Sequence, residues 1–219
     1  MKLYLASANL DDVRWAAGRR LIEGVLTTHT LTRADEVDDE RERLREISRL
    51  IEGPVLATVH AVTAEDAYHD GRELARLADN IIVQVPFVED AIEAIRRLSS
   101  EGVRVIATLV FNAAQAVLAA KAGAGTVCVH IDQIDAQGED GVETIAGIHR
   151  VFQLHGVECD VLAAMPRNAA QFTGCALAGA DAIAVSPEAL RALLLHPLTD
   201  RGIDQFLTDL SRTHRTRVK

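Results

Sequence analysis

The chain has 219 residues, of which 48% are hydrophobic, so it can bury one substantial core and we expect a single domain. Its formal net charge of −9 argues against a nucleic-acid partner, because such proteins gain most of their affinity from clustered cationic side chains. The opening residues show no basic stretch followed by an apolar run, and no segment of about 18 uncharged apolar residues occurs, so we predict no membrane partner and a cytoplasmic location.

Short apolar runs rich in β-branched residues recur along the chain and alternate with helical patterns. Runs buried on both faces and separated by single helices are typical of parallel strands, because each crossover helix returns the chain to the same edge. We predict strands at 2–7, 24–28, 54–62, 81–87, 104–111, 125–131, 159–165 and 182–186. Apolar residues three and four apart predict helices at 11–22, 37–52, 63–80, 88–102, 113–123 and 186–197.

Eight such units predict an α/β fold, a (β/α)₈ TIM-type barrel, over residues 1–198. An open doubly wound sheet is the rival, but it usually has a glycine-rich turn after its first strand, and the turn here reads ASANLDD. Residues 199–219 add a C-terminal helix and a basic tail, with Ile203, Phe206 and Leu210 on one apolar side. Because this side must be buried somewhere, we predict that it packs on a neighbouring subunit of a homo-oligomer.

The acidic run at 34–46 is interpreted as the solvent-facing side of a helix. The three cysteines, Cys128, Cys159 and Cys175, form no CxxC pair, and their odd number within apolar segments indicates buried thiols in a reducing compartment. We therefore predict no structural disulfide.

Several local strings identify a family. Residues 108–127 read TLVFNAAQAVLAAKAGAGTV, residues 133–138 read QIDAQG in the loop after the sixth strand, and residues 163–168 read AAMPRN at the end of the seventh. Together with the opening KLYLAS and GVLTT runs, they resemble the transaldolase family, especially its short branch that includes bacterial fructose-6-phosphate aldolase. The likeness covers nearly the whole chain and implies a barrel enzyme of carbohydrate metabolism.

The resemblance also shows what the chain lacks. In that family a lysine in a string like VKVP ends the fourth strand and forms a Schiff base with a ketose, whereas residues 83–86 here read VQVP. The amide of Gln84 cannot form the imine, because its nitrogen lone pair is delocalised into the carbonyl. Ala6 matches a family aspartate that handles protons, His130 a tyrosine of the shorter branch, and Met165 a serine. We predict that Schiff-base chemistry has been lost.

No other lysine is placed to substitute. Lys2 precedes the first strand and Lys121 belongs to the helix that leads into the sixth, so both are predicted at the bottom of the barrel. Barrel chemistry occurs at the opposite end, where the strands have their C-termini. Lys219 lies on the tail and could reach a pocket only from another subunit.

Polar residues at the strand ends are the candidate site. Side chains alternate along a strand, and the resemblance implies that Gln84 points inward as the matching family lysine does. We therefore expect these residues to line a mouth suited to a phosphorylated or polyhydroxylated small molecule. The candidates are Thr27, His29, Thr58, His60, Gln84, Thr108, Asn112, His130, Asp132 and Arg167.

Roles can be assigned within this set. His130 is the candidate general acid/base, and Gln84 and Thr108 would position the substrate. Arg167 matches the family arginine that holds the substrate phosphate, with a surface salt bridge as the alternative. Ser186, just ahead of Pro187, is predicted to cap a helix rather than act as a nucleophile. Thr27, Thr58, His60, Asn112 and Asp132 would also bind substrate.

We expect no cofactor and no metal. The weaker alternative is a divalent ion held by His29, His60 and His130, but no HxH or HExxH spacing supports it. Two functional classes stay open, a lysine-independent enzyme and a non-catalytic binding or regulatory protein. A mouth plugged by Met165 or Phe111 would favour the second class.

Overall fold

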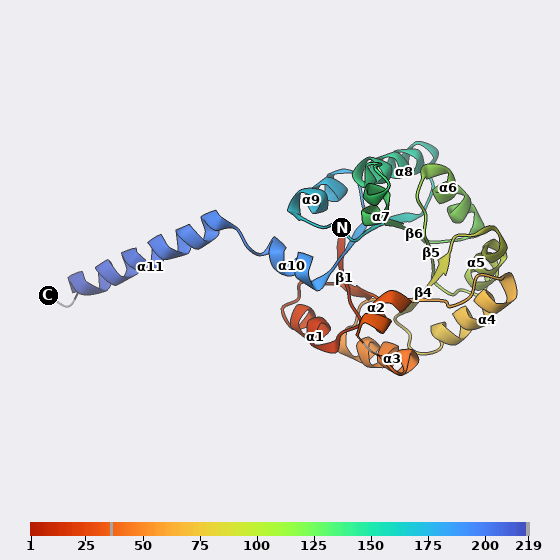
Figure 1. The fold of residues 1–219 in the computed structure, drawn as a ribbon, viewed down its shortest axis with the longest axis horizontal. Coiled ribbons are helices and arrows are strands. Elements are labelled where there is room, and N and C mark those ends of the chain that lie inside the picture. Colours follow the sequence, from red (N-terminus) through yellow and green to blue (C-terminus); the bar gives the residue numbers. More distant parts are fainter. Residues whose placement is uncertain (36, 218–219) are drawn as a thin grey trace.

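The computed structural model describes residues 1–35 and 37–217, with side chains described as far as Leu210. Within these residues eight parallel strands close into a barrel in chain order, with β8 returning to pair with β1 (Figure 1). The closure confirms the predicted TIM-type barrel and excludes the open sheet, whose edge strands would stay unpaired. The strands are β1 (Lys2–Ala6), β2 (Gly24–Leu26), β3 (Val55–Thr58), β4 (Ile81–Pro86), β5 (Val105–Thr108), β6 (Thr126–His130), β7 (Asp160–Ala164) and β8 (Ala182–Val185).

Helices surround the barrel on its outside, as the end-on view shows (Figure 1). Two short helices fall outside the eight predicted strand–helix units: α2 begins at His29, soon after β2 ends at Leu26, and α7 occupies much of the QIDAQG segment, which we had interpreted as a loop. The helices are α1 (Leu10–Gly18), α2 (His29–Ala34), α3 (Glu40–Leu50), α4 (Ala64–Ala75), η1 (Glu89–Ala91), α5 (Ile92–Ser100), α6 (Ala113–Ala122), α7 (Ile131–Ala136), α8 (Gly141–His155), α9 (Ala169–Leu177), α10 (Pro187–Leu193) and α11 (Pro197–Arg217).

Alternation along the strands divides the core into two parts. Side chains that point outward, many of them valines, pack between barrel and helices. Side chains that point inward form a separate cluster in which Tyr4, Leu56, Ile106 and Leu162 are the bulky members. The inward residues at the C-terminal ends of β1, β7 and β8 are alanines, so less of the barrel is filled near that end. The inward cluster is Tyr4, Ala6, Leu26, Leu56, Ile106, Cys128, Leu162, Ala164, Ala182 and Ala184.

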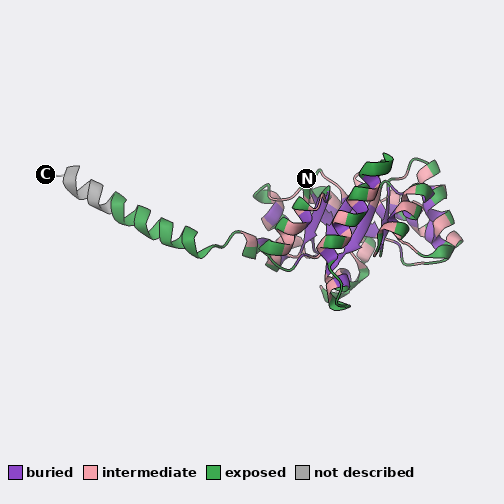
Figure 2. Cartoon of the chain, turned by 90° about the horizontal axis from the view of Figure 1, so that it is seen from above, coloured by how far each residue is buried: buried purple, intermediate pink, exposed green. Residues whose placement is uncertain are grey.

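The C-terminal helix α11 leaves the barrel and projects away from it (Figure 1). It begins at Pro197, two residues before the boundary predicted from the sequence. Its apolar residues Ile203, Phe206 and Leu210 are exposed in the single chain, and Figure 2 shows the helix exposed along its described length. The side chains of the basic tail lie outside the described residues. No helix in the described part of the chain is both long and apolar enough to cross a membrane.

Candidate functional site

A cavity of about 330 Å³ opens at the C-terminal ends of the strands, and we call it the mouth pocket. Its volume falls in the range of small-molecule sites, and its walls mix apolar and polar groups as such sites do. Met165 lines the pocket without closing it, and Phe111 borders a different cavity, so neither residue plugs the mouth. The lining residues are Leu26, Thr28, His29, Thr30, Leu31, Thr58, Pro86, Thr108, Leu109, His130, Asp132, Gln133 and Met165.

His130, the last residue of β6, is the most buried titratable group of the mouth pocket. Its side chain turns inward, with Nε2 3.3 Å from Thr108 Oγ1 and 3.8 Å from Cys128 Sγ. Desolvation lowers the pKa of His130 below 6.5, while the nearby Asp132 carboxylate acts in the opposite direction. The imidazole is therefore neutral near pH 7, the state in which it can accept a proton.

The thiol beside His130 is not an activated nucleophile. Cys128 is fully buried, and desolvation raises the pKa of its thiol to about 12, so it stays protonated at neutral pH. Burial also raises the pKa of Cys159 to about 12 and that of Cys175 to about 11. All three cysteines are free; Cys128 and Cys175 are buried as predicted, whereas Cys159 is only partly buried.

Gln84 points into the barrel from β4 and is 1% exposed. Its amide nitrogen donates to the Thr27 carbonyl at 3.1 Å and to Thr58 Oγ1 at 3.0 Å. Thr58 is the register partner of Gln84 on the neighbouring strand β3 and also lines the mouth pocket. The inward orientation expected for position 84 is what the structure has. The prediction that Gln84 lines the mouth was wrong, because it is not among the lining residues of the mouth pocket and contacts Thr58, which is.

The two lysines that the structure describes lie away from the mouth pocket. Lys2 begins β1, at the opposite end of the barrel, with Nζ 3.8 Å from Asp160 Oδ2. Lys121 is in the last turn of α6, just before the strand that ends at His130. Neither is among the pocket's lining residues, and Lys219 lies outside the described residues.

Two predicted pocket residues point elsewhere. Because Leu26 faces the barrel interior, the next residue Thr27 alternates to the other side, where its hydroxyl donates to the Leu56 carbonyl at 2.7 Å. Asn112 is the N-cap of α6, and its Oδ1 accepts from the Gln115 amide at 2.9 Å. In both cases the polar side-chain atom that we had expected to contact a ligand makes a hydrogen bond to a backbone group instead.

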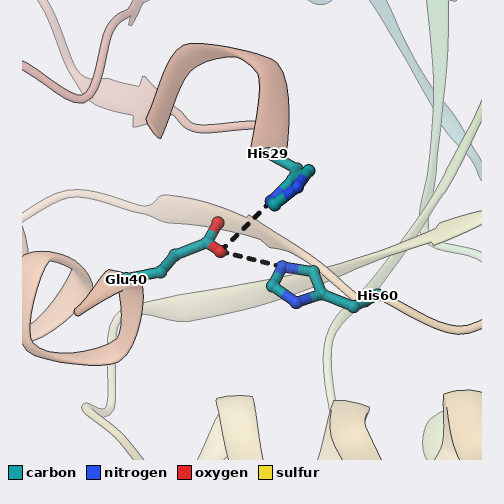
Figure 3. A group of neighbouring side chains, drawn as sticks. All are labelled: His29, Glu40 and His60. Atoms are coloured by element: carbon teal, nitrogen blue, oxygen red, sulfur yellow. Dashed lines mark ion pairs between the residues drawn. The ribbon is translucent and has the colours of Figure 1, made fainter. Parts of the chain in front are cut away.

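His60 also lies outside the mouth pocket. It follows β3, and its Nε2 is 2.9 Å from Glu40 Oε2, while Nδ1 of His29 is 3.6 Å from the same oxygen (Figure 3). The two imidazole ring centres are 5.0 Å apart. Two of the three candidate metal ligands therefore meet, but around Glu40 rather than with His130.

Glu40 was missed by sequence reasoning. It lies in the acidic run that we had interpreted as the solvent-facing side of a helix, yet its side chain is only 19% exposed. No fixed spacing links it to either histidine, because the three residues come from α2, α3 and the segment after β3. The closed barrel alone places these segments side by side.

A second cavity, of about 350 Å³, adjoins the mouth pocket and shares Asp132 and Met165 with it. Arg167 lines it, and its Nη2 donates to the Asp132 carbonyl at 3.1 Å; no ion pair of Arg167 occurs among the described residues. Ser186 caps α10 through the Ala189 amide, as predicted. We call this cavity the arginine groove; its walls are Asp132, Met165, Pro166, Arg167, Ser186, Glu188, Ala189 and Ala192.

Two further features of these cavities favour a functional role. Leu109 and Met165, which follow β5 and β7, have φ of 60° and 66°, and both line the mouth pocket. Non-glycine residues held in the left-handed region cluster at functional sites. In the described part of the chain, Oδ1 of Asp132 is buried without a hydrogen-bond partner. A native buried oxygen of this kind needs a partner, and a ligand hydroxyl would provide one.

Similarity to known proteins covers almost the whole chain. Residues 27–218 match the family described as transaldolase/fructose-6-phosphate aldolase. A protein of Bacillus anthracis named "Probable transaldolase 1" is 38% identical over 213 residues, which is 97% of this chain and 99% of the relative. Proteins named "Probable transaldolase" from Alkaliphilus metalliredigens and Clostridium perfringens are 35% and 34% identical over 209 and 212 residues. These matches span 95% and 97% of this chain and 97% and 98% of the relatives.

Proposed function

Because the chain belongs to the transaldolase/fructose-6-phosphate aldolase family, we propose that it is an enzyme that acts on a phosphorylated sugar or a related polyhydroxylated small molecule without a Schiff base. The observation that carries this proposal is the glutamine at position 84. The family string like VKVP has become VQVP, and Gln84 points inward beside Thr58. An amide at this place can hold a ligand or neighbouring group by hydrogen bonds but cannot attack a ketone.

His130 is the proposed general acid/base. It lines the mouth pocket, is neutral near pH 7 and has Thr108 Oγ1 3.3 Å from its Nε2. A base with these properties can remove a proton next to a substrate carbonyl or return one, which is the proton transfer that aldol-type chemistry requires. We assign to Thr108 and Gln84 the positioning of substrate and of the groups around it.

The arginine groove is the proposed place for an anionic group of the ligand. One nitrogen of the Arg167 guanidinium donates to a backbone carbonyl, and the other N–H donors remain available for phosphate oxygens. Asp132 lies between the groove and the mouth pocket, and its unpartnered Oδ1 suits a sugar hydroxyl. A ligand with a phosphate at one end and hydroxyls along its length fits this distribution of donors and acceptors.

A binding or regulatory protein without turnover is the second candidate. It is favoured by the lack of an evident nucleophile, since the Cys128 thiol stays protonated and neither described lysine lines the mouth pocket. The open mouth favours the enzyme, because Met165 leaves the cavity accessible. The two candidates differ in one measurement, the consumption of a bound sugar phosphate.

The test combines trapping with turnover. Purified protein is incubated with dihydroxyacetone or fructose 6-phosphate, reduced with borohydride and weighed by intact-protein mass spectrometry. We expect no mass increase, and an adduct on a lysine peptide would contradict the proposal. Conversion of a bound sugar phosphate, followed by NMR and lost in His130→Gln, supports the enzyme; binding that is unchanged over hours supports the second candidate.

We also propose a homo-oligomer and a cytoplasmic location. The apolar side of α11 is exposed in the single chain, and a neighbouring subunit is the natural surface to cover it. The free thiols are what a reducing compartment would maintain.

A further inference from the structure

We propose that His29, Glu40 and His60 form a binding site for a divalent transition-metal ion, with Zn²⁺ as the best-matched probe. We call these three residues the rim triad. Each offers one ligand atom, and the three atoms all lie within 4.8 Å of one another (Figure 3). This inference concerns a site beside the mouth pocket and does not depend on the pocket's substrate or on turnover.

The distances are close to those that a bound ion would impose. Zinc bonds to imidazole nitrogen and carboxylate oxygen of about 2.0–2.1 Å in a tetrahedral shell place neighbouring ligand atoms about 3.3 Å apart. The two distances to Glu40 Oε2, 3.6 Å from His29 Nδ1 and 2.9 Å from His60 Nε2, lie on either side of that value. Small side-chain rotations would suffice to convert the direct contacts into bonds to a shared ion.

The backbone holds the rim triad in place. His29 and Glu40 are the first residues of α2 and α3, and the His60 amide donates to Asp70 Oδ2 at 2.8 Å. The second carboxylate oxygen of Glu40 lies 3.2 Å from Thr32 Oγ1. Metal-ligating carboxylates are commonly oriented by such an outer hydrogen bond, which leaves the other oxygen for the ion.

The ligand types select a class of metal. Two imidazoles and one carboxylate suit Zn²⁺ and its first-row neighbours, whereas Mg²⁺ and Ca²⁺ prefer shells made of oxygen. Three protein ligands leave a coordination position open for water or another small ligand. The side chains of His29 and His60 are 60% and 51% exposed, so an ion can enter from solvent. His29 also lines the mouth pocket, which puts the ion at its edge.

The chain offers an internal comparison. His69 and Glu65 form another exposed histidine–carboxylate contact, with Nε2 and Oε1 2.6 Å apart on α4. That pair is not part of any cluster of three potential ligands among the described residues, whereas the rim triad adds a second imidazole. If the rim triad were only an ion pair, changing it should affect Zn²⁺ binding no more than changing the His69–Glu65 pair does. If it is a metal site, only changes in the rim triad should weaken binding.

The experiment is a Zn²⁺ titration of the chelator-treated, full-length protein by calorimetry. We expect saturable binding of one equivalent that His60→Gln and Glu40→Gln each weaken by more than about 100-fold, since even outer-shell changes lower metal affinity by about 10- to 100-fold. His69→Gln, the matched control, should bind as the unaltered chain does. Far-UV circular dichroism establishes that each variant is folded.

A second measurement avoids substitution altogether. In the unaltered protein the ring resonances of His29 and His60 should shift on addition of one equivalent of Zn²⁺, while those of His69 stay in place. The proposal is overturned if no saturable binding occurs, if His69→Gln weakens binding as much as His60→Gln, or if the resonances of His29 and His60 do not respond.

Discussion

Replacing Gln84 by lysine is the most direct test of the proposal that this barrel acts without a Schiff base because position 84 holds an amide. The new amine would lie in a place that is 1% exposed, beside the Thr27 carbonyl and Thr58 Oγ1. Both acceptors can receive N–H donors from a neutral amine, so the Gln84→Lys side chain can satisfy them without a charge. A neutral amine also has the free lone pair that attack on a ketone requires.

The magnitude follows from the burial of the amine. Desolvation lowers the pKa of a fully buried lysine by up to about 3–5 units, and each unit corresponds to about 1.36 kcal/mol. A shift of about 3 units from about 10.4 would reduce the free energy of unfolding by about 4 kcal/mol near neutral pH. Because the unfolded chain binds the extra proton, this loss shrinks as pH rises from about 7 to about 10.

The assay pairs stability with trapping. Urea unfolding of the Gln84→Lys and unaltered proteins near neutral pH and near pH 9.5 should show the smaller difference at the higher pH. Borohydride reduction with dihydroxyacetone should give an adduct on the peptide that contains residue 84 in Gln84→Lys alone. The adduct need not be turned over, because Ala6 stands where the family has an aspartate that handles protons, and alanine cannot transfer a proton. A folded Gln84→Lys protein without an adduct, or an adduct on the unaltered chain, would refute the reasoning.

Three other changes have defined outcomes. Arg167→Ala should weaken binding of fructose 6-phosphate by about 1.5–3 kcal/mol in calorimetry if the guanidinium makes a charge-assisted contact, while Arg14→Ala on α1 should leave it unchanged. Burial lowers the pKa of His130 in the folded protein. The free energy of unfolding should therefore decrease as the pH drops below about 6.5, because the unfolded chain takes up the proton more readily. Urea unfolding near pH 7.5 and near pH 5 measures this loss of stability, which should be smaller in His130→Gln. An equal loss in both proteins would contradict the lowered pKa of His130. Phe206→Glu should lower the mass in solution towards the 23.7 kDa of one chain, and an unaltered protein already at that mass would exclude the proposed oligomer.

The strands and most helices could be predicted because their signals are local. Apolar runs such as Ile81–Pro86 and the three- and four-residue spacing of α5 depend only on which faces of a strand or helix are buried. Because strands and helices alternate through eight units, the sequence favoured a closed barrel over an open doubly wound sheet. The replacement of a family lysine by Gln84 was likewise visible in four consecutive letters.

Short helices and side-chain directions were harder to predict. Helix α7 has only six residues, too few for periodicity to identify it. Thr27 and Asn112 are polar residues at strand ends, the pattern of pocket residues, but one faces away from the interior and the other caps α6. The energetic need to satisfy nearby backbone groups decided both cases.

The amino-acid order by itself determined the barrel and the position of His130 at the end of a strand, because burial periodicity and strand polarity act over a few residues. The inward direction of Gln84 was indicated by the resemblance of its string to that of the family. Tertiary structure alone decided that His29, Glu40 and His60 meet and that Arg167 and Asp132 share a groove. These contacts join segments that are distant in the chain. They form only when closure of the sheet brings the loops at one end of the barrel together, which no local pattern encodes.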